Sequence, residues 1–582
     1  MKTITNTLLI AAAVVISGCF PQQQCGKATF EVKVTDFAAF PDDGKDDRAA
    51  IVAAIGACRG RQGAKLVFAR GRYDIDGGPM GERRRRQPSL DIKHINNMTI
   101  EGNGAELIGH DYSTMFHFTE CQNITINNLT VDWNPLPYTQ GKVVEVNDEY
   151  VDIEVVAPFT AQAGRRTEAI LGYDLERRRM ARRYTDHYQK GYEKTSEVVR
   201  PGIMRLFIGR QDRFAGALPP VGTHIIARHQ VYGYQALQFV KCSNVRIENV
   251  NIYSNPGMGV IGSICRDIFI RHLKVMLRPG SGRWMSCTAD ATNFPGCRGT
   301  LVIENCLFEG MGDDATNIKS GHYSVVSERV NDKTLSISRG RRGGIPPVPH
   351  IGDRLELSGE DLVPYTTVTV KSVKRNEEKE ALIVEFSDKL PERAGKGDIV
   401  GNPSSCPSVH IRNCMVIRNR ARGFIIKNRG AIIEDCYFQD ITASAIGMNA
   451  DINVWWESIG SHDIIIRNNH FVDCRFDPDV VRGIIECLTN VGERRSPPGV
   501  HQRITIENNI IQGSGADGVK IGSADGLVIA DNIIDGIEDC TINIYDSRNI
   551  RITGNRVTNS SAALKTDGCE TDTIKLKNNI GL

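Results

Sequence analysis

The chain lacks an excess of charge of either sign, because 71 lysine and arginine residues balance 69 aspartate and glutamate residues. This balance gives no reason to expect nucleic acid or an anionic membrane surface as the main partner. Long apolar runs are missing beyond the N-terminus, so no membrane-spanning helix is expected there. Local basic clusters at residues 83–86 and 176–184 are interpreted as solvated loops or interfaces.

Metal-binding spacings are also missing. The 16 cysteines form no CxxC pair and no cluster with histidine at zinc-site spacing, so no structural metal is predicted. Several of them, including Cys306, Cys414 and Cys436, occupy one position of the repeat described below. We interpret most of the cysteines as small buried hydrophobic residues and not as a disulfide framework.

The N-terminus has the pattern of a secretory signal over residues 1–18. Lys2 supplies a short positive region, residues 8–15 are apolar, and the sequence ISGC ends in a small residue before Cys19. This pattern resembles a bacterial lipoprotein signal, which implies that Cys19 is lipidated and anchors an exported protein to the cell membrane, with the outer membrane or cell surface expected. An ordinary cleaved signal with an incidental cysteine is the alternative, and it also implies export.

Internal periodicity dominates the rest of the sequence. Two apolar residues two positions apart, a polar break and two further apolar positions recur, as at Val245, Ile247, Val250 and Ile252. Copies of this pattern begin at Ile124, Val245, Ile268, Leu301, Val409, Ala431, Ile464, Ile504, Leu527, Ile550 and Ile574. Many consecutive starts differ by 22 to 24 residues. Alternation at period two predicts strands with one buried face, and the repeat is too short for a strand plus a full helix.

Such coils bury their apolar side only by stacking on one another. Asparagine recurs at the polar break, where it tolerates a left-handed conformation and can bond to the next coil. We therefore predict an all-β fold, a right-handed parallel β-helix; a leucine-rich solenoid fits less well because its fixed leucine frame is missing.

The front end of the chain predicts a capping helix. Asp46 or Asp47 can begin this helix, and Ile51, Val52 and Ile55 give it one apolar face. The segment resembles the opening of pectate-lyase-like β-helix proteins, in which such a helix covers the exposed strand edges of the first coil.

Two segments interrupt the period, and both contain alternating apolar runs that predict antiparallel β insertions on one side of the solenoid. Insertions of this kind commonly build the binding face of a repeat protein. The predicted units are a signal peptide (1–18), an N-terminal cap with the first coils (30–135), a β insertion (136–230), coils with candidate catalytic acids (231–322), a second, barrel-like β insertion (323–402) and C-terminal coils (403–582).

Two adjacent acids, Asp313 and Asp314, interrupt the apolar pattern within GMGDDATNIKSGHY at residues 310–323. The letters DATN begin at Asp314 and also at Asp290, which predicts that these two acids share one position in consecutive coils, about 4.8 Å apart. Glycines before the pair, including Gly312, are expected to permit a bulge, so that both adjacent carboxylates face outward. The sequence therefore predicts a tight cluster of three carboxylates.

Like charges at this distance raise the pKa of at least one carboxylate and provide a protonated acid beside ionised bases. Glycoside hydrolysis needs this combination, because one acid protonates the leaving oxygen while a base activates water. Calcium binding by an acidic corner and turn capping by aspartate are the alternatives. Asn293 and Asn317 belong either to a stacked asparagine ladder or to a substrate-binding surface.

An aspartate one coil before a Gly-Asp-Asp group resembles the polygalacturonases of glycoside hydrolase family 28. The wider sequence resembles glycoside hydrolase family 110, the exported bacterial α-1,3-galactosidases, over essentially the mature chain. The matching stretches are HQVYGYQALQFVKCSNV (229–245), NPGMGV (255–260), DATNFPGCRGTLVIENCLFEGMGDDATN (290–317) and RARGFII (420–426).

This resemblance implies inverting, exo-acting hydrolysis of terminal α-1,3-linked galactose, in blood group B-type or linear glycans, without a metal or another cofactor. The implied partner is an oligosaccharide or glycoconjugate that ends in α-galactose. By the same resemblance Asp313 is the general acid, and Asp290 and Asp314 activate water.

Five further residues are predicted to bind substrate: Asn317, Lys319, Arg422, Trp456 and Glu457. Lys319 lies in Ile-Lys-Ser where the family pattern leads us to expect Val-His-Gly, and its cation could bind a hydroxyl or lower a neighbouring pKa. Arg422 could point at the acids from a later coil. Trp456 and Glu457 lie in a long excursion between coils, where an exposed tryptophan could stack on a sugar or could instead pack within the loop.

Two other functions stay open. One is a polygalacturonase-like hydrolase, which is disfavoured because the Gly-His-Gly and Arg-Ile-Lys motifs of those enzymes have no clear equivalents here. The other is a non-catalytic glycan-binding β-helix, which would have no use for a cluster of acids that share a proton.

Overall fold

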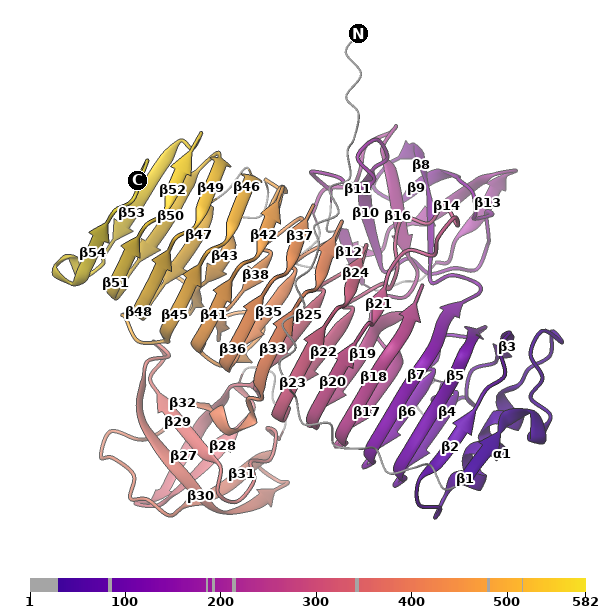
Figure 1. Ribbon diagram of the computed structural model, residues 1–582, viewed down its shortest axis with the longest axis horizontal. Coiled ribbons are helices and arrows are strands. Elements are labelled where there is room, and N and C mark those ends of the chain that lie inside the picture. The colour runs from indigo at the N-terminus through magenta and orange to yellow at the C-terminus, as the bar shows by residue number, and fades with distance from the viewer. Residues whose placement is uncertain are drawn as a thin grey trace, which may run out of the picture.

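The computed structural model describes residues 30–582 apart from 82–85, 185–186, 191–193, 212–215, 341–344, 479–481 and 515–516. The predicted signal, the lipidation site Cys19 and residues 83–85 of the first basic cluster lie outside the described residues. Parallel strands stack into a solenoid that runs through the whole molecule (Figure 1). None of the helices in the described ranges is long and apolar enough to span a membrane.

Two parallel sheets form the walls of the solenoid. The long sheet has 23 strands within the described residues: β1 (Phe30–Lys33), β2 (Ala64–Val67), β3 (Arg72–Ile75), β5 (Asn96–Gly109), β7 (Gln122–Trp133), β18 (Ser243–Ile252), β20 (Arg266–Arg271), β21 (Lys274–Val275), β23 (Arg298–Glu304), β24 (Leu307–Glu309), β33 (Ser408–Arg412), β34 (Met415–Ile417), β36 (Arg429–Glu434), β37 (Tyr437–Gln439), β41 (His462–Arg467), β42 (His470–Val472), β45 (His501–Glu507), β46 (Ile510–Ser514), β48 (Ala524–Ala530), β49 (Ile533–Ile537), β51 (Arg548–Thr553), β52 (Arg556–Thr558) and β54 (Ile574–Lys577).

The short sheet has 12 strands in the part of the chain that the structure describes: β4 (Leu90–Lys93), β6 (Phe116–Thr119), β17 (Tyr234–Val240), β19 (Gly257–Ser263), β22 (Thr292–Pro295), β25 (Thr316–Lys319), β35 (Phe424–Lys427), β38 (Ile446–Gly447), β43 (Gly483–Cys487), β47 (Asp517–Gly522), β50 (Cys540–Tyr545) and β53 (Ala562–Asp567). A coil runs along the long sheet, turns, and then enters the short sheet. We call this turn, which precedes each short-sheet strand, the entry corner.

The strand register confirms the predicted repeat and the β-helix fold. Val245 pairs with Ile124 on one side and with Ile268 on the other. The later repeat starts also lie side by side, from Ile464 through Ile504 and Leu527 to Ile550. The apolar positions of the repeat are buried in one continuous core, which is the reason for the alternation along the strands.

The N-terminal helix α1 (Arg48–Cys58) covers the first coils, as predicted. Ile51 and Ile55 are buried, but Val52 is 40% exposed and lies outside the apolar face, contrary to our prediction. The carboxylate of Asp46 accepts the N–H of Arg48 at 3.0 Å near the start of the helix. The described residues also include the short 3₁₀ helices η1 (Val34–Phe37), η3 (Pro403–Ser405) and η4 (Thr571–Thr573).

The asparagines of the polar breaks have two different roles. The first asparagine of each pair, such as Asn468 and Asn508, has a left-handed backbone with φ of 57° and 54°. The second, such as Asn469 and Asn509, is buried and stacks on its equivalent in the next coil, with an Nδ2 to Oδ1 distance of 3.0 Å. In earlier coils Cys306, Cys414 and Cys436 hold this second position as free, buried thiols, which confirms their predicted role as small apolar residues.

The first insertion is antiparallel and consists of β8 (Tyr138–Val146), β9 (Tyr150–Val155), β10 (Ala169–Asp174), β11 (Arg179–Met180), β12 (His187–Lys190), β13 (Glu197–Arg200), β14 (Ile203–Phe207), β15 (Arg210–Gln211) and β16 (His224–Arg228). The second forms a closed barrel of β27 (Ser324–Asn331), β28 (Thr334–Ser338), β29 (Arg354–Ser358), β30 (Pro364–Asn376), β31 (Ala381–Phe386) and β32 (Ile399–Gly401). Two small pairs complete the fold, β26 (Gly321–His322) with β40 (Glu457–Ser458), and β39 (Ala450–Asp451) with β44 (Thr489–Asn490).

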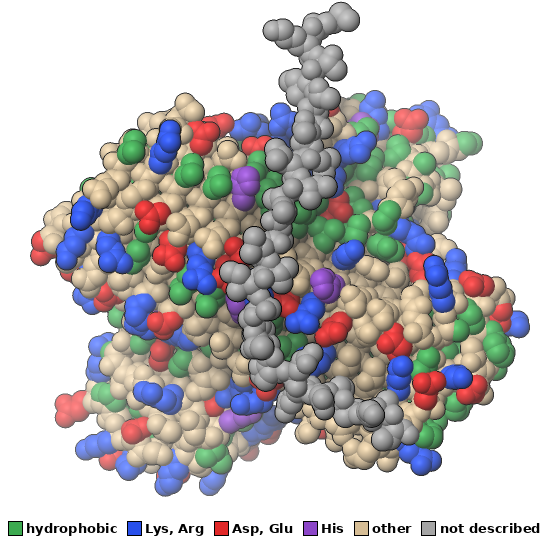
Figure 2. Space-filling model, viewed as in Figure 1, with side chains coloured by type: hydrophobic (Ala, Val, Ile, Leu, Met, Phe, Trp, Pro, Cys, Tyr) green, Lys and Arg blue, Asp and Glu red, His purple; other side chains and the backbone are tan. Residues whose placement is uncertain are grey.

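The insertions lie on opposite sides of the solenoid, contrary to the prediction that both emerge on one side (Figure 1). The first interrupts the chain at the entry corner between β7 and β17, whereas the second follows β25 at the far end of a short-sheet strand. The two insertions therefore flank the outer face of the short sheet, the first near the starts of its strands and the second near their ends. Acidic and basic side chains are interspersed over the face shown in Figure 2, in agreement with the balanced charge of the sequence.

Candidate active site

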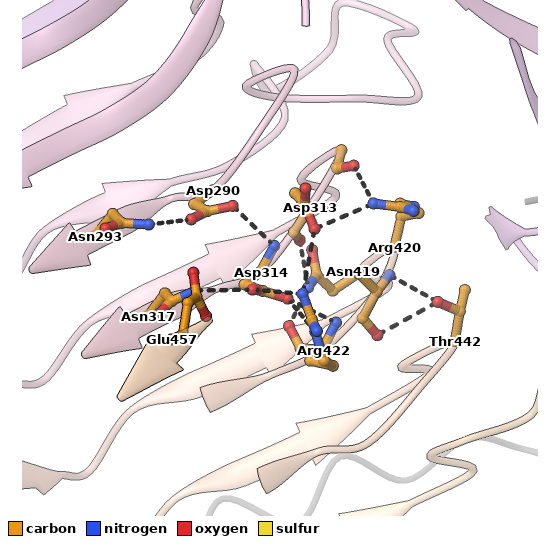
Figure 3. Close-up of polar contacts among 12 residues, drawn as sticks. Asp290, Asn293, Asp313, Asp314, Asn317, Asn419, Arg420, Arg422, Thr442 and Glu457 are labelled. Atoms are coloured by element: carbon orange, nitrogen blue, oxygen red, sulfur yellow. Dashed lines mark hydrogen bonds and ion pairs between the residues drawn. The ribbon is translucent and has the colours of Figure 1, made fainter. Parts of the chain in front are cut away.

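The three predicted acids meet at the entry corner of two consecutive coils. Asp290 precedes β22, and Asp313 and Asp314 precede β25 (Figure 3). Thr292 pairs with Thr316 and Asn293 with Asn317, so Asp290 and Asp314 occupy the same position one coil apart, as the shared DATN predicts. One carboxylate oxygen from each of the three acids lies within 4.8 Å of the others.

The local backbone differs from the predicted bulge. Strand β24 has already ended at Glu309 and β25 begins at Thr316, so the paired acids lie in a corner loop. Gly312 is required there because a Cβ atom would lie 2.4 Å from the carbonyl oxygen of Thr288. The acids are also more enclosed than an outward-facing pair, since Asp313 is 7% and Asp314 is 1% exposed.

Asp290 and Asp314 each contact an asparagine of their own coil. Nδ2 of Asn293 donates to Asp290 at 2.7 Å, and Nδ2 of Asn317 lies 3.5 Å from Asp314. These contacts orient the carboxylates and differ from the coil-to-coil asparagine ladder that we considered for both residues. The backbone N–H of Asp314 also approaches Asp290 at 3.3 Å, which links the two coils directly.

Two arginines from the next coil supply positive charge. Arg422 binds Asp314 with both ends of its guanidinium, at 2.7 Å from Nε and 3.0 Å from Nη2. Arg420 reaches Asp313 at 3.1 Å, and the hydroxyl of Tyr232 donates to the other oxygen of Asp313. The structure therefore brings Arg422 to the acids as predicted and adds Arg420 and Tyr232.

Charge and burial shift the pKa values of the three acids in different directions. Burial and the charges of Asp313 and Asp314 raise the pKa of Asp290 well above its usual value. Burial also raises the pKa of Asp314, partly offset by Arg422. For Asp313 burial acts in the same direction, but Arg420, Arg422 and the Tyr232 hydroxyl outweigh it and lower the pKa. These shifts favour a proton on Asp290 in the free site, whereas the family resemblance makes Asp313 the general acid.

Lys319 and Glu457 lie together at the other end of β25. The carboxylate of Glu457 binds the ammonium groups of Lys319 and Lys427, and all three side chains are largely enclosed. Burial opposes the effect, but the two lysines lower the pKa of Glu457 and keep it ionised. Glu457 belongs to β40, which pairs with β26, so the 449–461 excursion covers this side of the site.

Trp456 does not form the exposed stacking surface that we considered. It is 9% exposed and packs in an apolar cluster with Tyr323, Ile399 and Ile459, where the barrel meets the solenoid. The neighbouring Trp455 is 43% exposed. The prediction of a sugar-stacking role is therefore wrong for Trp456, because its ring joins two parts of the fold.

Sequence reasoning missed several residues at the site. Arg228, at the end of β16, is fully buried and donates from Nη1 to the carbonyl oxygens of Thr288 at 2.8 Å and Gly312 at 2.9 Å. Asn419 donates to the carbonyl oxygen of Asp313 at 2.9 Å. Arg420 stood in the quoted RARG stretch and could have been found there. Tyr232 stood in the quoted stretch 229–245 and could also have been found there, whereas Arg228 carries no such signal because its place depends on how the first insertion docks.

Comparisons with known proteins agree with the fold and identify homologues. The family profile described as "Right handed beta helix region" matches residues 460–580. Alpha-1,3-galactosidase B of Bacteroides thetaiotaomicron is 29% identical over 76% of this chain and 75% of its own length. Alpha-1,3-galactosidase A of Shewanella woodyi is 27% identical over 82% and 81% of the two chains. The chain is a homologue of these glycoside hydrolases.

This relationship confirms the resemblance to glycoside hydrolase family 110. Among solved structures, the catalytic unit of a GH87 alpha-1,3-glucanase from Streptomyces thermodiastaticus aligns over 96% of this chain and 69% of its own, with 11% identity and a TM-score of 0.46. In a glycoside hydrolase, enclosed carboxylates of opposite protonation state are the groups that transfer protons to and from the glycosidic oxygen and water.

The same three acids have the geometry of a cation site, since each offers one ligand atom within 4.8 Å of the others. One observation favours proton chemistry: Arg420 and Arg422 already provide positive charge at hydrogen-bonding distance from Asp313 and Asp314.

Proposed function

We propose that the protein is an exo-acting, inverting α-galactosidase that hydrolyses terminal α-1,3-linked galactose. The observation that carries the proposal is the enclosed cluster of Asp290, Asp313 and Asp314, with opposite pKa shifts and with Arg420 and Arg422 beside it. The names of the homologues support the galactose substrate and the linkage.

The proposed inversion rests on the family resemblance, and the cluster of three acids accommodates direct displacement by water. In inverting enzymes with two carboxylates, acid and base lie about 6.5–9.5 Å apart so that water fits between them. Here a third carboxylate makes another arrangement possible, because one water can bond at about 2.8 Å to two oxygens that lie within 4.8 Å of each other. We assign that water to Asp290 and Asp314, which leaves Asp313 for the leaving oxygen.

The exo mode is supported by the covered side of the site. Lys319, Lys427 and Glu457 close the far end of the short-sheet strands beside the acids. A terminal sugar fits against such a wall, and its hydroxyl groups can bond to the two lysines and the carboxylate. Blood group B-type and linear α-1,3-galactosides both satisfy this requirement, since they end in the same sugar.

We also propose that the protein is exported and held at the bacterial membrane by lipid on Cys19, on the basis of the N-terminal sequence pattern alone. Expression of the full chain and of a Cys19→Ala variant, followed by separation of membrane and soluble fractions, tests this. The variant is expected to leave the membrane fraction. Retention of the variant on membranes would show that another feature anchors the chain.

One experiment tests the activity. The protein is incubated with an α-1,3-digalactoside, the branched blood group B trisaccharide, an α-1,4-digalactoside and polygalacturonate, and the products are followed by NMR. Release of galactose from the α-1,3 substrates, first seen as the β anomer, supports the proposal. Release of α-galactose first, or release from none of these substrates, contradicts it.

Catalysis by the acids alone predicts that chelators have no effect on activity. Because Arg420 and Arg422 already balance the charge of Asp313 and Asp314, the site needs no cation. Galactose release is measured before and after dialysis against EDTA, and again with added calcium. A loss of activity that calcium restores would favour the metal interpretation of the cluster.

A further inference from the structure

A cavity lies at the entry corner of coils that precede those of the acids, closer to the N-terminus. It has a volume of about 340 Å³ and is lined by residues that include Arg86, His110, Asp111, Tyr112, Arg165 and Tyr234. Ligand-binding cavities commonly measure about 300–1,000 Å³, so the space is large enough for a sugar unit. None of these residues belongs to the catalytic cluster.

The strand register gives the distance from this cavity to the acids. Tyr234 is the first residue of β17 and pairs with Gly257 of β19. The N–H of Gly259, two residues further along β19, donates to the carbonyl oxygen of Asp290. Two strand spacings of about 4.8 Å therefore separate Tyr234 from the coil of Asp290, a distance of about 10 Å. This distance is within the reach of an oligosaccharide that extends from the acids along the solenoid axis.

One short segment joins the two places. The hydroxyl of Tyr232 donates to Asp313, and its ring is 44% exposed beside the acids. Two residues further on, Tyr234 lines the cavity. Gly233 between them has a φ of 139°, in a region that other residues rarely adopt. The segment Tyr232–Tyr234 thus presents one aromatic ring to the acids and the next one to the cavity.

The chemistry of the cavity suits a carbohydrate. Arg165, from the first insertion, donates to the Tyr112 hydroxyl at 2.6 Å and to Gln162 Oε1 at 2.9 and 3.1 Å, and both acceptors are neutral. Arg86 pairs with Asp111 at 2.9 Å. Guanidinium groups, carboxylates and tyrosine rings together supply donors, acceptors and apolar faces, which are the groups that bind the hydroxyls and faces of sugar rings.

We propose that this cavity is the binding site for the leaving group, where it holds a sugar of a neutral oligosaccharide beyond the unit attached to the terminal galactose. This inference rests on the proposed galactosidase activity. Because the Glu457 excursion covers the opposite side of the acids, the rest of the substrate extends towards the first insertion, which contributes Arg165. The protein is then an enzyme for extended glycans, with a site that a disaccharide leaves empty.

The test compares substrates that share the terminal α-1,3-linked galactose but differ in length, from the disaccharide to the linear tri- and tetrasaccharide. For the wild type we expect kcat/KM to rise about tenfold from the disaccharide to the longer substrates, which corresponds to about 1.4 kcal/mol. Arg165→Gln is expected to reduce most of this gain. Arg200→Gln, at an exposed position of β13 in the same insertion, is the matched control and should keep it.

A second measurement separates this inference from the proposed activity. Binding of the galactose-free trisaccharide product to Asp290→Asn protein is followed by NMR, with and without Arg165→Gln. Weaker binding in the double variant supports the site even if no substrate tested releases galactose, a result that would refute only the activity. Equal binding in both proteins, or a loss of kcat/KM in Arg165→Gln that is the same for every substrate length, would overturn the inference.

Discussion

Asp290 and Asp313 lie in one cluster, yet their surroundings favour opposite protonation states. Burial and the charges of Asp313 and Asp314 raise the pKa of Asp290, and the hydrogen bond from Asn293 offsets only part of this rise. Asp313 is held by Arg420 and by the Tyr232 hydroxyl, which lower its pKa. Protons within such a cluster belong to the group as a whole. A bound substrate that displaces the Tyr232 hydroxyl from Asp313 would make the ionised form of Asp313 less stable. The proton could then move from Asp290 to Asp313.

The dependence of the hydrolysis rate on the acidity of the leaving group identifies the general acid. If Asp313 protonates the leaving oxygen, Asp313→Asn should reduce hydrolysis of an α-1,3-digalactoside by about 10²–10⁴-fold, the usual contribution of general acid catalysis. An aryl α-galactoside with an acidic phenol needs no such proton and should be affected much less. Asp290→Asn is the matched variant. Because Asp290 is assigned to activate water, this variant should reduce the hydrolysis rates of both substrates by the same factor. The reverse pattern would assign the acid to Asp290, in line with its raised pKa.

The Tyr232 hydroxyl should control the pH dependence of the reaction. Its hydrogen bond stabilises the ionised form of Asp313, so Tyr232→Phe should raise the pKa of that carboxylate. The limb of the kcat/KM profile that reports Asp313 should then move to higher pH. Tyr437→Phe, at a tyrosine that bonds to Gln439 away from the site, is the control. Unchanged limbs in Tyr232→Phe would show that the contact does not persist in solution.

At the scale of the coil, the second residue of the polar break is buried in successive coils, but its residue type changes along the solenoid. Cys306, Cys414 and Cys436 occupy it near the acids, and asparagines occupy it afterwards. The junction is direct, since Asn469 accepts the N–H of Cys436 at 2.9 Å. Each later asparagine binds backbone groups that the corner would otherwise leave unpaired.

Removal of one asparagine from the middle of this column should be costly. Asn532 accepts the N–H of Asn509 at 2.9 Å and donates to the carbonyl oxygen of Ile506 at 2.9 Å. Asn532→Ala leaves both groups buried without a partner, so we expect a loss of about 2–4 kcal/mol in the free energy of unfolding. Asn579→Ala, at the partly exposed end of the column, should cost less because water replaces the lost bonds. Equal urea midpoints for the two variants would contradict this account.

At the scale of the whole molecule, the repeat could be predicted from the sequence because the same positions of each coil carry buried apolar side chains. Ile504, Leu527 and Ile550 point into the core for the same reason, so their spacing gives the register directly. The pairing of Asp290 with Asp314 followed in the same way. Contacts between distant segments could not be read, because no period links Arg228 of the first insertion, or Tyr232 just after it, to Asp313. Trp456 was misassigned for the same reason, since the barrel that buries it lies far from it in sequence.

Buried histidines should make the fold sensitive to moderate acid. Burial lowers the pKa of His501 and of His229 to about 3. His501 accepts the N–H of Ser461 at Nδ1, so a proton on that nitrogen would break the bond. The unfolded chain takes up a proton on each histidine below about pH 6.5, whereas the folded chain does not, and stability therefore falls as the pH decreases.

Between pH 7 and pH 5 each such histidine should cost about 2 kcal/mol in the free energy of unfolding. The raised pKa values of Asp290 and Asp314 act in the opposite direction, because those acids gain protons in the folded state first. The contribution of one histidine is isolated by comparing wild type with His501→Asn in urea at both pH values, where the variant should lose about 2 kcal/mol less. His94→Asn, at a side chain that is 69% exposed, is the control and should keep the wild-type difference. The same pH dependence in His501→Asn and wild type would mean that His501 is protonated within the fold.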